Sequence, residues 1–595
     1  MPTRNTDSSA ITRLNQARAV AFGQTRQNLL TNSSSPLRVY PATNPQSGNF
    51  DNSVMLDVVN GNYTTYTQTF PITVISVPPT SELPFPLIPQ PAGFIDPPIP
   101  IDQTVLYAFQ SVLAFGASSN YAPTVMSRFL YVWFMSVVSA WNWVQSSPQL
   151  PGTHDGWNFT VQNALNYDDS TTWMVITVNQ IMSTMAITGY NSNYLLDRTK
   201  TCHGWDSQTL ATEIARIQAA GNWSQWLSAW NSWLTARNAD GYLVAKVAGP
   251  LPGSPNSQYK NGSTTLNPLL TVDPSTYVAP TQWTPLVLNG VNKLYATPLW
   301  NNVRSTCLSA QDEQDLSGLA APFFPSTPQA RYADLSGMLD KTATMTDYDK
   351  LTAEWWAGGP TTATPPGILM WYWKNYMATY NISDTLGTRA FMLSGLQVAI
   401  GLFETGRVVW GQKLGYTQAR PIQDVRRLWR GQVVTGYTGV GVSGEAWLPY
   451  QEATFVTPPF PDFVSGHSGF SAVFANTMAQ WFGDAIRTDG LVTMTDLNLV
   501  TPDLAGTVQT QPFGTIVFPV GSSRIQPGVV PAQATTVSFT KWSDLAQSAG
   551  ISRQYGGIHC MSAHLGSLAL IGDNDGVVLN GTTGLYKMIK SSWSF

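Results

Sequence analysis

Long segments without proline constrain the fold of this 595-residue chain most strongly, because proline is otherwise frequent, with 41 copies. Four such segments lie in the first half of the chain, at 103–117, 124–144, 171–197 and 206–237. In the last of them, apolar residues recur at three- and four-residue spacing, among them Leu210, Ile214, Ile217, Trp226, Trp230 and Trp233. This is the period of an amphipathic helix. The segments therefore predict a helical bundle with a tryptophan-rich core.

Helical patterns return in the second half, at 368–380, 384–412, 467–482 and 542–570, the last interrupted at Gly556 and Gly557. Residues 488–540 are rich in Thr, Val, Pro and Gly and predict an excursion with strands. The predicted fold is mainly α, with two helical bundles and irregular or β excursions. Its parts are a Pro-rich, irregular or β N-terminal arm (1–100), an N-terminal bundle (101–245), a loop-rich connection (246–345) and a catalytic bundle (346–595).

Charge and cysteine content exclude several classes of protein. Charged residues make up 11% of the chain and the net charge is −4, so no general electrostatic surface for nucleic acid is expected. Three cysteines, Cys202, Cys307 and Cys560, support neither a disulfide framework nor a structural zinc site. The N-terminus lacks the apolar core of a signal peptide, and the most apolar run, 129–144, is shorter than the ~20 residues that span a membrane. We expect a soluble protein without a membrane partner, whose compartment and state of oligomerisation stay open.

Ser465-Gly466-His467 follows a proline-rich stretch and precedes an apolar, helix-forming run. The first amides of a helix lack intrahelical acceptors, and the positive end of the helix dipole attracts anions. Ser465 adds a hydroxyl, Gly466 allows close approach to the backbone, and His467 would act as an acid or base near neutral pH. An ordinary helix cap with a surface histidine is the simpler interpretation of this motif alone.

Two further segments carry cations in a chain that is poor in charge. Lys413 precedes Arg420-Pro421, and Pro421 predicts that a helix ends between Lys413 and Arg420. Arg553 lies six residues before His559, and the intervening glycine pair must bend the chain if the two are to meet. Taken singly, these segments also fit a solvated helix end and a core histidine. Together with the serine motif they would make a complete cradle for a tetrahedral oxyanion such as phosphate or vanadate.

The order and spacing of these motifs resemble the three-part signature shared by vanadium-dependent haloperoxidases and type 2 phosphatidic acid phosphatases. Ala-Glu-Trp-Trp-Ala at 353–357, Pro-Pro-Gly at 365–367 and Pro-Pro-Phe-Pro at 458–461 resemble the haloperoxidase side. The chain departs from that pattern at Ile368, where histidine is usual, and at Val464, where proline is usual. After His559 it reads Cys-Met-Ser-Ala-His, where an aromatic residue and then an aspartate are usual. Asp424 is the local candidate for the group that orients His559.

The resemblance implies the chemistry of a haloperoxidase with vanadate, vanadium(V), as its cofactor. His559 would be the single metal ligand, and His467 would accept a proton from hydrogen peroxide. Lys413 would polarise the bound peroxide and also help to hold the oxyanion. The other expected oxyanion contacts are Arg420, Arg553, Ser465 and the Gly466 amide. Halide (bromide, chloride or iodide) would be oxidised to hypohalous acid, which halogenates an organic acceptor.

Trp410, three residues before Lys413, and Phe460, seven before His467, resemble the halide pocket of chloroperoxidase-type sites. Two other functions stay open at this point. In an acid phosphatase with the same cradle, His559 would be the nucleophile that carries phosphate and His467 would protonate the leaving group. In an assembly or structural protein, the cradle would be a vestigial anion pocket.

Overall fold

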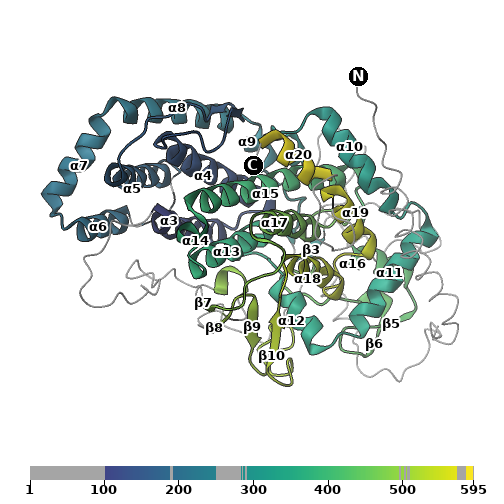
Figure 1. Ribbon diagram of the computed structural model, residues 1–595. Helices are drawn as coiled ribbons and strands as arrows, with labels where there is room; N and C mark the ends of the chain where they lie inside the picture. Colours follow the sequence, from purple (N-terminus) through teal and green to yellow (C-terminus); the bar gives the residue numbers. More distant parts are fainter. Residues whose placement is uncertain are drawn as a thin grey trace.

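The computed structural model describes residues 101–185, 187, 190, 192–248, 283, 286–288, 291–494, 497–501, 504, 509–572, 584–593 and 595. The predicted N-terminal arm, 1–100, lies outside the described residues, as does the segment 249–282. The described part is mainly α, as predicted, with short two-stranded antiparallel hairpins between helices (Figure 1). In this part of the chain no helix is long and apolar enough to cross a membrane.

The first bundle contains six longer helices and a hairpin of β1 (Thr153–His154) and β2 (Trp157–Asn158). Two predicted helices are broken in the structure. The segment 171–197 divides because the sequence after Thr184 includes Gly189 and Asn191, which are poor helix formers. The segment 206–237 divides at Ala220, whose ψ of 138° is extended. The helices are α3 (Ile101–Ser118), α4 (Pro123–Trp143), α5 (Tyr167–Thr184), α6 (Ser192–His203), α7 (Ser207–Ala219) and α8 (Gly221–Asn238), followed by the short α9 (Tyr242–Ala245).

The second bundle surrounds α15 (Thr388–Tyr416), a 29-residue helix that is buried along most of its length. The predicted helix 384–412 is interrupted before it at Gly387, whose φ of +89° ends the short α14 (Ile382–Leu386). The other helices of this bundle are α12 (Asp347–Trp355), α13 (Thr364–Thr379), α16 (Pro421–Leu428), α17 (Gly466–Phe482), α18 (Trp542–Tyr555), α19 (Met561–Ile571) and α20 (Gly584–Trp593).

Residues 246–345 differ from the expected loop-rich connection, because two helices lie within them. Ser309 and Thr327 cap α10 (Ala310–Ala320) and α11 (Pro328–Ala343) by accepting hydrogen bonds from the first-turn amides. Their polar surfaces and short lengths hide the helical period in the sequence. The remaining elements here are the hairpin of β3 (Val287–Leu288) and β4 (Val291–Asn292), and the 3₁₀ turns η4 (Trp300–Asn302) and η5 (Ala321–Phe323).

The strands predicted in 488–540 are confirmed. β7 (Leu491–Met494) pairs with β8 (Gln509–Pro512), and β9 (Thr515–Phe518) pairs with β10 (Thr535–Ser538), both antiparallel. These hairpins lie beside α12 and α13 (Figure 1). A third hairpin, of β5 (Val433–Thr435) and β6 (Gly441–Ser443), follows α16, and the 3₁₀ turns are η6 (Gly444–Ala446) and η7 (Leu497–Leu499).

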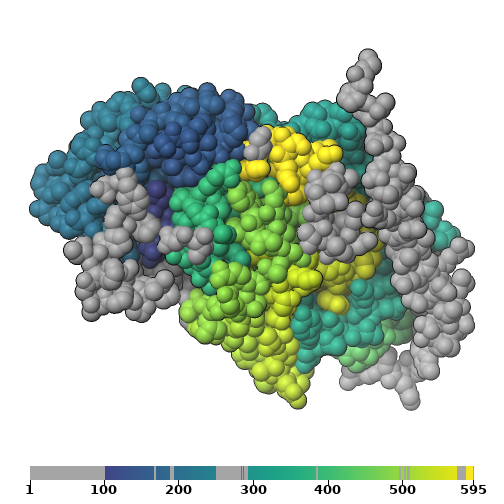
Figure 2. Space-filling view, viewed as in Figure 1, coloured from purple at the N-terminus to yellow at the C-terminus, as the bar shows by residue number. Residues whose placement is uncertain are grey.

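One hydrophobic core joins the two bundles. α15 packs between α4 of the first bundle and α17 of the second (Figure 1). Tyr131 of α4 stacks on Phe403 of α15, with ring centroids 5.3 Å apart, and Phe134 meets Trp373 of α13 edge-on at 5.1 Å. The space-filling view shows the first bundle, in blue, forming one end of the molecule against the green and yellow residues of the second (Figure 2).

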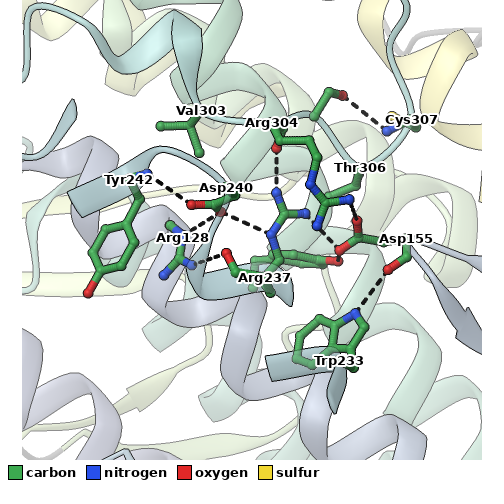
Figure 3. Close-up of polar contacts among 12 residues, drawn as sticks. Arg128, Asp155, Trp233, Arg237, Asp240, Tyr242, Val303, Arg304, Thr306 and Cys307 are labelled. Carbon is green, nitrogen blue, oxygen red and sulfur yellow. Dashed lines mark hydrogen bonds and ion pairs between the residues drawn. The ribbon is translucent and has the colours of Figure 1, made fainter. Parts of the chain in front are cut away.

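A buried ionic cluster also holds the first bundle together (Figure 3). Asp240 accepts hydrogen bonds from Arg128 of α4 and Arg237 of α8, both at 2.9 Å. Asp155, in the β1–β2 turn, accepts from Arg237 at 2.7 Å and from Arg304 at 3.0 Å. The cluster therefore links α4, α8, the hairpin and the chain that leads into the second bundle.

Asp240→Ala is expected to lower the free energy of unfolding by about 3–5 kcal/mol, because two buried guanidinium groups lose a shared carboxylate. Denaturant unfolding followed by circular dichroism measures this loss. Asp197→Ala is the matched control, since Asp197 is largely exposed and pairs with Lys200 at the surface; it should cost about 0–1 kcal/mol. Equal losses in the two variants would contradict the prediction.

Candidate active site

The Ser465-Gly466-His467 motif begins helix α17, as the sequence predicts. Ser465 is the N-cap, and its hydroxyl accepts a hydrogen bond from the amide of Ser468 at 3.4 Å. Its own amide donates to the carbonyl of Ala563 in α19, at 2.8 Å. A Cβ on Gly466 would lie 3.7 Å from the ring of Trp410, so the start of the helix lies beside α15.

The cationic motifs lie at helix ends that face the same region. Lys413 is in the last turn of α15, which ends at Tyr416, before Arg420, as predicted. Arg420 is extended, with ψ of 151°, and precedes Pro421 at the start of α16. Arg553 is in the last turn of α18. His559 lies in the connection to α19, which turns at Gly557 with φ of +66°, so the glycine pair bends the chain as expected.

These residues converge on one buried cluster. Arg420 Nη1 lies 3.1 Å from His559 Nε2 and 2.9 Å from the carbonyl oxygen of Ile558. Lys413 Nζ donates to the carbonyl oxygens of Pro461 and Asp462, at 2.8 and 3.0 Å. The three side chains are at most 2% exposed. Residues separated by almost 150 positions in the sequence thus share one site.

The arginines retain donors that the protein does not satisfy. Arg553 donates to Ser552 Oγ at 3.0 Å and to the carbonyl oxygen of Ala353. Its Nη1 atom, and the Nη2 atom of Arg420, are buried and have no hydrogen-bond partner among the described residues. Leaving charged donors unpaired in the interior is costly. An oxyanion would supply the missing acceptors, so the residues present fit vanadate or phosphate.

Burial and mutual repulsion shift the ionisation of this cluster toward the neutral forms. Burial, and then neighbouring cations, hold the pKa values of His559 and His467 well below the usual range. Burial, and then Arg420, lower the pKa of Lys413 strongly. Burial lowers the pKa of Arg420 to about 10 and that of Arg553 to about 9. Because burial disfavours the charged form of each of these groups, a bound anion would oppose the shifts.

Binding of inorganic phosphate is expected to take up protons, because the anion raises the pKa of Lys413 from its lowered value. Affinity should therefore fall as pH rises between that lowered value and the usual lysine range, by about tenfold per pH unit for one proton. Calorimetry in buffers of different ionisation enthalpy counts the protons. Phosphate itself also exchanges protons on binding, and the Lys413→Met variant measures that contribution alone. An equal proton count in the wild type and the variant would contradict the assignment to Lys413.

The carboxylate that orients His559 is Asp462, and the sequence-based choice of Asp424 is wrong. Asp462 Oδ1 lies 2.6 Å from His559 Nδ1, and both groups are buried. A carboxylate accepts, so Nδ1 carries the proton and Nε2 presents its lone pair to the site. Asp424 instead accepts a hydrogen bond from Arg331 Nε at 2.9 Å. The Nη1 atom of the same arginine donates to Asp462 at 3.1 Å.

Sequence reasoning missed Asp462 and Arg331. A usable signal was present for Asp462, because it is an acidic residue inside the Pro-Pro-Phe-Pro-Asp-Phe-Val-Ser-Gly-His segment of a chain that is poor in charge. Arg331 had no such signal. It lies on α11, in the region expected to be loop-rich.

Asp462→Asn is expected to weaken retention of vanadate by about 10–100-fold, because an amide no longer holds His559 in the Nδ1–H tautomer. Equilibrium dialysis with vanadium analysis measures the affinity. Asp424→Asn is the matched control: it also removes a carboxylate from Arg331, but it leaves Asp462 in place at His559 Nδ1. Equal losses of affinity in both variants would indicate general destabilisation rather than orientation of His559.

The Ala-Glu-Trp-Trp-Ala segment forms one wall of the site. The carbonyl oxygens at the end of a helix lack intrahelical donors. Here the carbonyl of Ala353 accepts from Arg553, and that of Trp356 accepts from His467 Nε2 at 2.7 Å. The buried Glu354 anchors the turn by accepting from Ser523 Oγ at 2.6 Å and from the Arg524 amide at 2.8 Å.

The aromatic pair expected at a halide pocket is also brought together. The rings of Trp410 and Phe460 lie 4.8 Å apart between centroids. Lys413 Nζ is 5.1 Å from the centroid of Phe460, and the Arg420 guanidinium is 4.8 Å from it. The indole of Trp410 donates to the carbonyl of Ala296 at 3.0 Å, which fixes its orientation. The pair thus forms an apolar wall directly beside the cations.

Residues 393–574, which contain all three motifs, match the family model of the VCPO second helical-bundle domain. These residues are therefore similar to a VCPO second helical-bundle domain. The resemblance to vanadium-dependent haloperoxidases is thereby confirmed for the part of the chain that carries the site. No curated protein matches the chain in sequence.

A likeness in fold to one solved structure extends beyond residues 393–574. An apo-type bacterial vanadium-dependent chloroperoxidase is 14% identical and matches with a TM-score of 0.51 over 80% of this chain and 96% of its own. The first bacterial vanadium-dependent iodoperoxidase is 16% identical, with a TM-score of 0.49 over 80% of this chain and 95% of its own. At these identities the likeness concerns the fold.

Proposed function

We propose that this chain is a vanadium-dependent haloperoxidase, which oxidises halide with hydrogen peroxide to hypohalous acid. One observation carries the proposal: two buried arginines, Arg420 and Arg553, have donors without acceptors among the described residues. They belong to the same site as His559, whose ring is oriented by a carboxylate, in the segment that is similar to the VCPO domain. Hypohalous acid then halogenates an organic acceptor.

The chain's own residues would hold vanadate in the following way. His559 Nε2 would be the protein ligand. Charge on the oxyanion would be balanced by Lys413, Arg420 and Arg553, and its oxygens would also accept from Ser465 Oγ and the Gly466 amide. Vanadate, when bound, supplies a Lewis acid that activates peroxide toward halide.

His467 is poised to move the proton of the peroxide. Its Nε2 faces a carbonyl, which only accepts, so Nε2 is protonated and Nδ1 carries the lone pair. Its lowered pKa keeps the ring neutral and ready to accept a proton at Nδ1. Lys413 would polarise the bound peroxide, while Trp410 and Phe460 would exclude water from the halide.

The test compares two activities of the purified full chain. Peroxide-dependent bromide oxidation should appear when orthovanadate is added and should decline in excess phosphate, which competes for the same cradle. Hydrolysis of a phosphate ester, assayed in parallel, tests the acid phosphatase alternative, in which His559 is the nucleophile. Bromide oxidation without vanadium would contradict the proposal, and absence of both activities would favour the structural alternative.

A further inference from the structure

A cavity of about 440 Å³ lies next to the candidate active site. Its walls come from the end of α12, the loop 357–362, the segment 450–459 before α17, and the β excursion, which contributes Val500, Arg524 and Ile525. The volume falls in the range of pockets that bind small organic molecules. The halide, the peroxide and the oxyanion are all far smaller than this space.

The cavity and the oxyanion site share the end of helix α12 as a wall. Ala353 and Ala357 line the cavity, while the carbonyls of Ala353 and Trp356 face Arg553 and His467. Pro459 lines the cavity too, and the next residue is Phe460, whose carbonyl accepts from Arg420 at 2.6 Å. A molecule in the cavity would therefore lie close to the place where hypohalous acid is formed.

The lining combines apolar side chains with one cation, Lys293, that has no ion pair with the described residues. Pro360, Phe455, Val500 and Ile525 are apolar. The cavity is left open at Gly359, where an added Cβ would meet Phe455 in ordinary contact, at 3.6 Å.

The acidic groups of the lining are already engaged. Glu452 pairs with Arg524, and Glu354 accepts from Ser523, Tyr450 and the Arg524 amide. Lys293 also lines the cavity and forms no ion pair with any described residue. An anionic group on a ligand would complete the charge balance at this position.

We propose that this cavity binds the organic acceptor, and that the acceptor is an electron-rich aromatic molecule, such as a phenol, with an anionic substituent. This rests on the proposed function. A ring carbon attacks the halogen of hypohalous acid, so that a carbon–halogen bond forms and the halogen–oxygen bond breaks. The ring carbon then loses its proton, which leaves with the hydroxide as water. Apolar walls hold the ring, and Lys293 holds the anion.

Two variants of the full chain test the site with 4-hydroxybenzenesulfonate as the probe and phenol as its neutral counterpart. Calorimetric titration without peroxide measures binding alone. Lys293→Met should weaken sulfonate binding by about tenfold or more, as expected for loss of a charge-assisted hydrogen bond, and leave phenol binding unchanged. Gly359→Phe should weaken binding of both, because its ring would take up space in the cavity that Gly359 lines. No binding to the wild type, or no effect of either variant, would overturn the proposal.

Oxidation of iodide to triiodide keeps this test separate from that of the proposed function, because the reaction needs no organic acceptor. With vanadate and peroxide present, both variants should form triiodide at the wild-type rate. Triiodide formation without probe binding would overturn only the assignment of the cavity. Probe binding without triiodide formation would overturn the haloperoxidase function and leave the binding site.

Discussion

His559→Ala should lose bound vanadium and peroxide-dependent bromide oxidation entirely. The residual contacts of the oxyanion would be hydrogen bonds and charges, since the one expected bond from the protein to the metal is gone. The variant also leaves Asp462 and Arg420 without the imidazole that lies 2.6 and 3.1 Å from them. Vanadium per chain after gel filtration, measured with activity and melting temperature on one preparation, checks the result.

His203→Ala is the control for loss of a histidine. His203 belongs to α6 of the first bundle and stacks on Trp205, away from the site motifs. It should retain vanadium and activity. If a folded His559→Ala protein retained vanadium at the wild-type level, another residue would be the ligand, and His564, five positions further on, would be examined first.

His467→Ala should retain vanadate but lose turnover by about 10²–10⁴-fold, the usual cost of removing a general acid or base. The oxyanion contacts expected from Ser465, Arg420 and Arg553 are untouched. The lost rate should be recovered in part as pH rises, because deprotonation of peroxide no longer depends on Nδ1. Steady-state bromide oxidation across pH, on protein of known vanadium content, measures both effects.

His564→Ala is the matched control for the structural alternative, in which His467 only supports helix α17. His564 of α19 has a buried imidazole, whose Nδ1 lies 2.8 Å from Ser468 Oγ on helix α17. This variant should lower the melting temperature and leave turnover per vanadium close to normal. Full activity in a folded, vanadium-loaded His467→Ala protein would contradict the acid–base role.

The sequence by itself determined the local geometry of the site. A serine and glycine before an apolar run start a helix, so Ser465 and Gly466 lie at the N-terminal end of α17, where the first amides lack intrahelical acceptors. Pro421 ends helical geometry at the residue before it, which separates Arg420 from Lys413. Helical periods likewise predicted a mainly α fold, although the breaks at Ala220 and Gly387 were missed because apolar spacing continues across them.

Only the tertiary structure decided which groups complete the site. Asp462 contacts His559, which is 97 positions away in the sequence, and Arg331, which is 131 positions away. The local sequences of these elements do not indicate that the three residues pair. The carbonyls of Ala353 and Trp356 are available because α12 happens to end there, and they are used because α17 and α18 pack against that end. Helix starts and stops follow from backbone conformation within a few residues. Partners for buried charges follow from how whole helices pack, so the sequence offered Asp424 as a candidate, whereas the structure places Asp462 at His559.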